Sequence, residues 1–385
     1  MSSRRTAFDL SANALAARLE AVRAAGRPLL DLTESNPVRA GLGWPAARLG
    51  TALAHPEAAA YHPDPRGSKG ARRAVAAYLA DRGGAVPVDR ILLTASTSEA
   101  YAFLLKLLCD PGDDVLVPAP AYPLLEVLAA LEAVELRRYP LLYDGTWQLD
   151  LPALRAAVGP RTRAVVVVSP SNPVGAVLSP EELTALDELC ADRDLALLSD
   201  EVFADTAAPG TPSALGARRA LAFHLSGASK VCGLPQLKVA WLAAAGPEAL
   251  VEPALERLEV IADAFLSVSG PSQLALEELL PEREVFLRPL RARLSENRSR
   301  LERFAGAPFS PLWGAGGWSV VLRVGETLDE EALCLTLLEE DQVAVQPGFY
   351  FDFQRKGHLV VSLLAPPTDF TEGIARLALR LAGGG

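Results

Sequence analysis

The stretch SKVCGL at residues 229–234 closely follows an apolar run, LAFHL, at residues 221–225. Its lysine, Lys230, is the third of three polar residues that follow strand-like apolar runs. Asn172 and Asp200 are the other two, and the spacings are 28 residues (172 to 200) and 30 residues (200 to 230). Open α/β sheets bind ligands at the carboxyl ends of their strands. We therefore expect an amine, a carboxylate and an amide to meet at one such edge.

These three groups together suit pyridoxal phosphate. The amine of Lys230 can form a Schiff base with its aldehyde, and the carboxylate of Asp200 can keep its pyridine nitrogen protonated so that the ring withdraws electrons from a carbanion. The amide of Asn172 can donate a hydrogen bond to the phenolic oxygen. Any one of the three residues alone could be a surface lysine or a strand-end cap. The combination predicts a cofactor site in which Lys230 and Asp200 are catalytic.

Short Val/Ile/Leu runs alternate with longer helical stretches, a pattern typical of a parallel sheet with crossover helices. The expected strands are Arg90–Ala95, Asp114–Val117, Ala164–Ser169, Ala196–Ser199, Leu221–Leu225 and Lys238–Ala243. The expected helices are Ser68–Asp81, Ser98–Leu108, Pro180–Arg193 and Pro247–Phe265. We predict an α/β protein whose large domain has a mostly parallel central sheet sandwiched by helices.

The Ser-Gly-Pro-Ser stretch at Ser269–Ser272 suggests a hinge at the start of a second unit. There, a helical segment, Leu274–Ala305, precedes strands around Ser319–Val324 and Leu359–Leu363. We divide the chain into an N-terminal arm (1–45) that contributes to the small domain and to an active-site loop, a large cofactor-binding domain (46–268) and a small α/β C-terminal domain (269–385).

A phosphate group needs an anchor, and the segment after the first expected strand offers one. Ser96, Thr97 and Ser98 open an apolar helix, where hydroxyls and free backbone N–H groups form an anion site. Ser96 with Glu99 also fits an ordinary capping box, and the two interpretations are compatible. The chain has no P-loop spacing and no GxGxxG after a strand, so ATP and NAD sites are disfavoured.

Composition narrows the class of partner. The 37 basic and 47 acidic side chains give a net charge of −10, which disfavours nucleic acid and offers no polybasic membrane patch. The first ten residues have no following apolar segment, so we expect a cytoplasmic protein. The four cysteines are widely spaced, with no CxxC pair, and predict neither disulfides nor a metal site.

The chain resembles the class I/II, aspartate-aminotransferase-type members of the fold type I pyridoxal-phosphate enzymes over nearly its whole length. Three motifs carry the resemblance: SPSNPVG at 169–175, SDEVF at 199–203, and Ser229-Lys230. The resemblance implies that Thr97 and Ser98 meet the phosphate and that Tyr122 stacks on the cofactor ring. It also implies that Tyr61 reaches the phosphate of a neighbouring subunit, and hence a homodimer with shared active sites.

Three positions depart from the family pattern. Lys238 stands where the family usually has an arginine on the phosphate, and a lysine there keeps the charge but loses the bidentate fork. Phe203 replaces a tyrosine that bonds the phenolic oxygen in many relatives. Val360 replaces the arginine that binds the α-carboxylate of the substrate.

A substrate carboxylate in a closed pocket requires a partner, because an unpaired buried charge costs about 3–5 kcal/mol. Either another arginine binds it, or the substrate is not a conventional α-amino acid. Arg39 is the preferred candidate, with Arg323 and Arg355 as further ones. Substrate contacts are also expected from Ser35 and Asn36, on the loop before Arg39, and from Trp318.

We therefore predict a pyridoxal-phosphate-dependent aminotransferase of amino acid metabolism, which moves an amino group from an amino acid or amine to a 2-keto acid. A β-lyase or another enzyme of Cα chemistry on the same scaffold is the alternative, because fold does not fix reaction. A regulatory domain that binds the cofactor is a more remote one, disfavoured by the negative charge and by the lack of a winged-helix segment ahead of the body.

Overall fold

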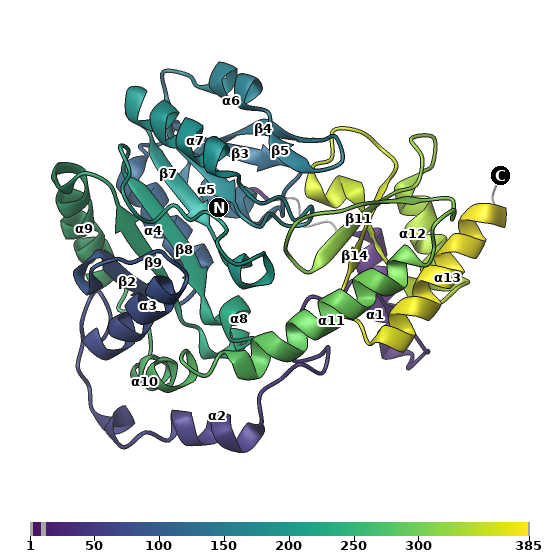
Figure 1. The fold of residues 1–385 in the computed structure, drawn as a ribbon, viewed down its shortest axis with the longest axis horizontal. Helices are drawn as coiled ribbons and strands as arrows, with labels where there is room; N and C mark the ends of the chain where they lie inside the picture. Colours follow the sequence, from purple (N-terminus) through teal and green to yellow (C-terminus); the bar gives the residue numbers. More distant parts are fainter. Residues whose placement is uncertain (1–2, 9–12, 384–385) are drawn as a thin grey trace.

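The computed structural model describes residues 3–8 and 13–383. A large sheet with its helices forms one side of the molecule, and a smaller group of strands and helices from the two ends of the chain forms the other (Figure 1). The long helix α11, Glu284–Glu302, runs from the first group to the second (Figure 1). In the described part of the chain, no helix combines the length and apolar character needed to cross a bilayer.

The large sheet has eight strands in the order β2-β9-β8-β7-β6-β3-β4-β5. From β8 to β4 neighbouring strands are parallel, whereas β9 is antiparallel to both its neighbours and β5 forms a hairpin with β4. The strands are β2 (Ile91–Thr94), β3 (Asp114–Ala119), β4 (Glu135–Tyr143), β5 (Trp147–Leu149), β6 (Thr162–Val168), β7 (Ala196–Asp200), β8 (Ala222–Gly227) and β9 (Ala240–Ala245). The predicted mostly parallel sheet is confirmed.

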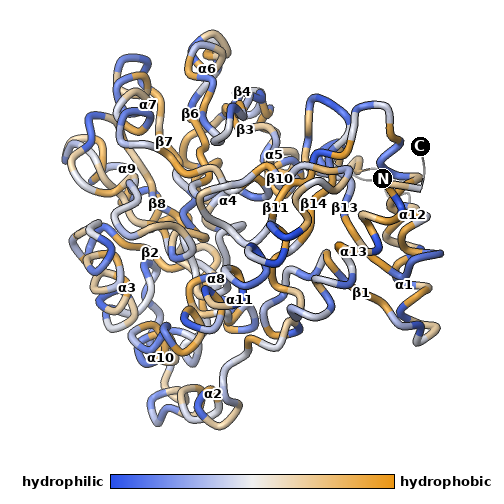
Figure 2. The backbone as a smooth tube through the Cα atoms, turned by 45° about the vertical axis from the view of Figure 1, so that its right-hand side comes forward, coloured by the Kyte–Doolittle hydropathy of each residue, from blue (hydrophilic) through white to orange (hydrophobic). Residues whose placement is uncertain are grey.

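Helices cover both faces of this sheet because its central strands are apolar on both sides. Alternate residues enter two separate cores: Val165 and Leu197 pack with α3 and α7, and Val166 and Leu198 pack with α4 and α9. Figure 2 shows the hydrophobic colours concentrated along these central strands. The helices of this part are α2 (Ala46–Leu53), α3 (Lys69–Asp81), α4 (Thr97–Leu108), α5 (Leu124–Glu132), α6 (Leu151–Ala157), α7 (Pro180–Asp192), α8 (Ala228–Val231), α9 (Glu248–Asp263) and α10 (Gly270–Leu279).

The smaller group is built on an antiparallel sheet with the order β10-β11-β14-β13. Near it, β1 pairs in parallel with β12, and α1 packs on α12, so the N-terminal arm lies with the C-terminal elements. The elements are β10 (Ser310–Leu312), β11 (Ser319–Arg323), β12 (Val343–Ala344), β13 (Gln346–Pro347), β14 (His358–Ser362), α12 (Glu330–Glu339), α13 (Pro367–Gly383), α1 (Ala14–Ala24) and β1 (Leu30–Asp31).

The structure differs from the expected elements at three places. The helical segment expected over 274–305 is divided into two helices, α10 and α11, by a short segment that contains Pro281, which has no N–H to donate to a helical hydrogen bond. The strand expected from Lys238 begins at Ala240, because Lys238 adopts a left-handed conformation with φ of 53°. The β4–β5 hairpin was not expected, since exposed charged residues interrupt the apolar pattern of β4.

The proposed hinge at residues 269–272 coincides with the start of a helix. The Ser269 hydroxyl accepts a hydrogen bond from the Ser272 N–H and caps α10. That helix packs on α2 and α3, and therefore on the large sheet's side of the molecule. The division of the chain at residues 45 and 268 stays a prediction.

Candidate active site

A cavity of about 410 Å³ lies where the carboxyl ends of the central strands face the small sheet. It combines the predicted cofactor groups with residues from the N-terminal arm and from β11, β13 and β14. The predicted residues that line it are Ser35, Thr97, Ser98, Tyr122, Asn172, Asp200, Phe203, Ser229, Lys230 and Trp318. Thr33 and Ser362, which are 329 positions apart in the chain, therefore line the same site.

Asp200 ends strand β7 and is buried. One carboxylate oxygen accepts a hydrogen bond from the Val202 N–H (3.2 Å), and the other accepts one from the Tyr101 hydroxyl (3.1 Å). Burial raises the pKa of Asp200 to about 6, against the lowering effect of these two bonds. The cavity thus contains a poorly solvated carboxylate that a nearby cation would stabilise.

Lys230 lies on the short helix α8, which follows β8 directly. Its Nζ lies 4.7 Å from the ring centre of Trp318 and 5.6 Å from that of Phe203, and the two rings pack edge to face. Burial lowers the pKa of Lys230 to about 8, although Asp200 opposes this shift. The amine can therefore lose or accept a proton near neutral pH.

The amino end of helix α4 opens into the same cavity. Ser96 caps the helix by accepting from the Glu99 N–H, and the Glu99 carboxylate accepts in return from the Ala95 N–H, one residue before the usual capping-box partner. Thr97 and Ser98, the first two residues of the helix, line the cavity. Hydroxyls and unpaired backbone N–H groups at this end favour an anion such as a phosphate.

The loop that carries Asn172 is fixed by close packing. The Ser171 hydroxyl accepts from the Ala176 N–H, and Gly175 accepts from the N–H groups of Ala315 and Gly316. Gly175 has φ of 68°, and a Cβ there would lie 2.3 Å from the Gly316 carbonyl oxygen. Only glycine fits this position, so the asparagine loop and the glycine loop before Trp318 hold each other in place.

The donor set fits pyridoxal phosphate. The cavity offers an amine of lowered pKa, a buried carboxylate with no ion-pair partner in the described part of the chain, an amide and an anion-binding helix end, which match the aldehyde, the ring nitrogen, the phenolic oxygen and the phosphate. Tyr122, which is 54% exposed, contributes an aromatic face to the same wall.

Other predicted residues lie elsewhere. Arg39 does not line the cavity: its side chain is 59% exposed and donates to Glu34 at 2.6 Å. Asn36 also lies outside, with its side chain accepting from the Val38 N–H. Lys238 is exposed beyond the short helix Pro235–Leu237. Tyr61, 79% exposed, lines a separate cavity of about 300 Å³.

Sequence reasoning missed several residues of the site. Tyr101 donates to Asp200, and its position four residues after Thr97, on the same face of α4, was a usable signal. Thr33, Ser319, Gln346, Phe351 and Ser362 also line the cavity. Nothing in their local sequence sets them apart, because they reach the site only when the N-terminal arm and the C-terminal elements fold against the large sheet.

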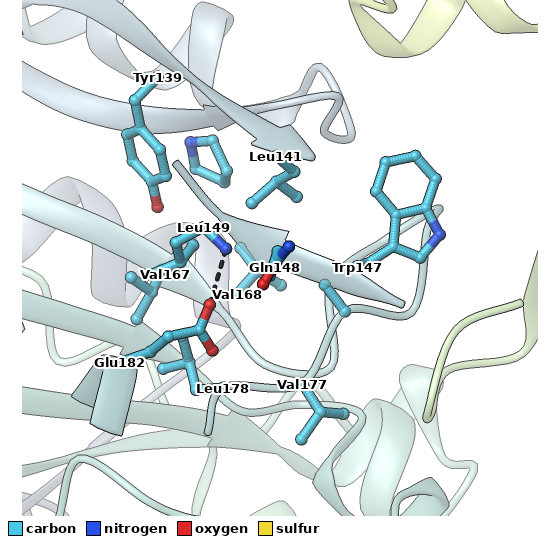
Figure 3. Close-up of a pocket in the computed structure, with 12 residues that line it drawn as sticks. Tyr139, Leu141, Trp147, Gln148, Leu149, Val167, Val168, Val177, Leu178 and Glu182 are labelled. Atoms are coloured by element: carbon cyan, nitrogen blue, oxygen red, sulfur yellow. Dashed lines mark hydrogen bonds between the residues drawn. The ribbon is translucent and has the colours of Figure 1, made fainter. Parts of the chain in front are cut away.

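Another pocket, under the β4–β5 hairpin, is not a rival site. Figure 3 shows mostly apolar side chains around it, with the Glu182 carboxylate accepting from the Leu149 N–H at 2.7 Å. Its volume is only about 10 Å³, which leaves room for no more than a water molecule.

Comparison with known proteins agrees with this geometry. Residues 29–377 match the family model for aminotransferase class I and II. The chain is 31% identical to the alanine aminotransferase of Mycobacterium tuberculosis (strain H37Rv), covering 94% of this chain and 87% of that one. It is 27% identical to the glutamate-pyruvate aminotransferase AlaA of Escherichia coli (strain K12), covering 93% and 91%.

Solved structures show the same fold. An aminotransferase from Escherichia coli has a TM-score of 0.87 at 25% identity and covers 100% of this chain and 98% of its own. A single mutant of the Thermus thermophilus aspartate aminotransferase has a TM-score of 0.85 at 25% identity and covers 99% of both chains. The chain therefore belongs to the aminotransferase class I and II family, a family of pyridoxal-phosphate-dependent enzymes that transfer amino groups.

Proposed function

We propose that this aminotransferase holds pyridoxal phosphate in the cavity around Lys230 and moves an amino group from a small amino acid, such as alanine or glutamate, to a 2-keto acid. The donors are suggested by the names of the relatives, an alanine and a glutamate-pyruvate aminotransferase. The observation that carries the proposal is that Lys230, Asp200 and the amino end of α4 share one cavity.

Each residue has a defined part. When bound, the cofactor supplies an electron sink for the bond that breaks at Cα. Asp200 would face its ring nitrogen, with the Tyr101 hydroxyl orienting the carboxylate. Thr97, Ser98 and Ser229 would hold the phosphate. Asn172 would donate to the phenolic oxygen, and Tyr122 would cover the ring.

Lys230 would also be the general base and acid. Its Nζ would take a proton from the substrate Cα and return it to the C4′ carbon of the cofactor, which requires a pKa near the working pH. The lowered pKa of about 8 meets that requirement. Phe203 offers no hydrogen-bond donor, so the amide of Asn172 would be the main neutral donor to the phenolic oxygen.

The assembly proposed is a cytoplasmic homodimer. Tyr61 supports it, because an aromatic side chain that is 79% exposed and remote from its own chain's cavity is free to enter a neighbour's site. If Lys238 acts on the phosphate, it must turn inward from its exposed position. Sedimentation of the purified protein, with Tyr61→Ala tested for weakened cofactor retention, would check the dimer.

The cofactor attachment is tested by borohydride reduction of the loaded protein followed by peptide mapping. We expect the label on Lys230, no label in Lys230→Ala, and normal labelling in the matched control Lys356→Ala, at an exposed lysine. A label on any other lysine, with Lys230 unmodified, contradicts the assignment. Return of the yellow absorbance only when a 2-keto acid is added after the amino donor separates an aminotransferase from a lyase.

A further inference from the structure

The small sheet presents one face to the cavity, and its register identifies the residues on that face. Ser319 pairs with Ser362, and Val360 pairs with both Val321 and Gln346. Because side chains alternate along strands, these five residues share one face. Ser319, Ser362 and Gln346 line the cavity, and the two valines pack beside them in the core.

This face brings no cation to the cavity. Among residues 3–8 and 13–383, the only basic side chain in the cavity wall is that of Lys230. Arg323 lies on the same face but four residues from Ser319, a distance of about 13 Å along the strand. Ser35 lines the cavity from the N-terminal arm. The arginine nearest to it in the sequence, Arg39, is paired with Glu34 and mostly exposed.

Uncharged hydrogen-bonding groups stand there instead. Ser35 and Ser319 contribute hydroxyls and Gln346 an amide, and none of these side chains has a hydrogen-bond partner in the described part of the chain. Ser362 differs, because its hydroxyl already donates to the Glu34 carbonyl and accepts from the Leu364 N–H. Two hydroxyls and one amide provide up to four donor hydrogens, enough for the two oxygens of a carboxylate.

We propose that the acid group of the substrate is bound by the uncharged side chains of Ser35, Ser319 and Gln346, without a guanidinium. This inference rests on the proposed function, since it concerns the amino acid that reacts beside Lys230. Such a site would discriminate only weakly between a substrate with a charged carboxylate and one with a neutral carboxamide. An arginine distinguishes a carboxylate from a neutral carboxamide strongly, whereas hydroxyl and amide groups can bond either one.

Paired donors test the proposal. L-Alanine and L-alaninamide differ only in the acid group, and each is mixed with the loaded protein while the cofactor absorbance is followed in single turnovers. We expect the two apparent binding constants to agree within about tenfold. A preference for alanine of a hundredfold or more would overturn the proposal, since it would indicate a cation from outside the described chain. Reaction of the amide alone would overturn it as well.

Binding can be measured apart from turnover. 2-Methylalanine and its amide have no Cα proton to lose, so their effect on the spectrum or melting temperature of the loaded protein reports binding alone. We again expect similar constants for the acid and the amide. Failure of both alanine and alaninamide to react, together with other amino acids, would count against the proposed function instead. The two failures are therefore distinguishable.

Substitutions locate the contact. Ser319→Ala should raise the Michaelis constant for alanine about fivefold with little change in kcat, whereas Ser310→Ala, an exposed serine of the same sheet, should not. Gln346→Arg adds a guanidinium to this face and should shift the ratio of alanine to alaninamide toward the acid by tenfold or more. An unchanged ratio in a folded Gln346→Arg protein, with Ser319→Ala also like wild type, would place the acid group elsewhere.

Discussion

Two adjacent carboxylates at the end of β7 have opposite surroundings. Asp200 faces the cavity, with two hydrogen-bond donors and a pKa raised to about 6. Glu201 faces the interior, where it accepts from Ser199, Ser213 and Ala214 and lies 3.2 Å from His224. Burial opposes its charge, but His224 and these donors outweigh burial and lower its pKa.

The difference separates function from stability. Glu201 is surrounded by partners within its own chain, so its charge stabilises the fold. Asp200 has two hydrogen-bond donors but no ion-pair partner among the described residues, and its charge is costly until a ligand cation arrives. A site prepared for a ligand is commonly strained or undersatisfied without it. Two neighbouring residues at the end of a strand can therefore serve opposite purposes, because successive side chains of an extended segment point to opposite faces.

The largest effect should come from Asp200→Ala. We expect the single-turnover rate of Cα proton removal to fall on the order of 10⁴-fold, because the ring nitrogen would lose its counter-charge. Cofactor should still bind through the phosphate anchors. Single-turnover absorbance, measured beside the melting temperature of the unloaded protein, checks both points. A rate near that of wild type with a lower melting temperature would make Asp200 structural.

The matched change, Glu201→Ala, should lower stability and leave turnover largely unchanged, which is the opposite of the effect expected for Asp200→Ala. Removing the acceptor leaves several buried donors and His224 without their partner, so we expect the free energy of unfolding to fall by about 3–5 kcal/mol. Turnover per folded molecule should remain close to that of wild type. Denaturant titration with activity corrected for the folded fraction measures this. Loss of activity at unchanged stability would contradict the assignment of Glu201 to stability and Asp200 to function.

The pH dependence of the stability of the unloaded protein should distinguish Asp200 from Glu201. Its folded-state pKa of about 6 exceeds the unfolded value, so its stabilising contribution is present below about pH 4 and is lost as the pH rises through 6. Asp200→Asn should then be more stable than wild type at pH 8, by up to about 3 kcal/mol, and equal to it near pH 4. A variant less stable at pH 8 would contradict the raised pKa.

A smaller effect concerns Lys230 in the unloaded protein. Burial lowers its pKa to about 8, so its reaction with an amine-modifying reagent should reach half its maximal rate near pH 8. Exposed Lys356 is the internal control for reagent reactivity. The chain has only five lysines, which makes peptide mapping straightforward. Equal midpoints for both would mean that the Lys230 amine is solvated.

The cofactor groups could be predicted because their signals are local. A polar residue directly after an apolar strand of a parallel sheet emerges at the carboxyl edge of the sheet, and Asn172, Asp200 and Lys230 line one cavity there. The substrate side could not be predicted in the same way. Arg39 was chosen for its charge and its loop, but its carboxylate partner, Glu34, lies five residues away and takes up its guanidinium.

The sequence by itself determined the alternation of strands and helices, the mostly parallel sheet and the residues suited to the cofactor, because hydrophobic periodicity and strand-end chemistry act over a few neighbouring positions. Only the tertiary structure decided which wall closes the cavity. Ser319, Gln346 and Ser362 reach it because strands β11, β13 and β14 pair in one register and dock against the asparagine loop. Register depends on contacts between segments distant in the chain, and a shift of one residue would replace this polar wall with the opposite, apolar face.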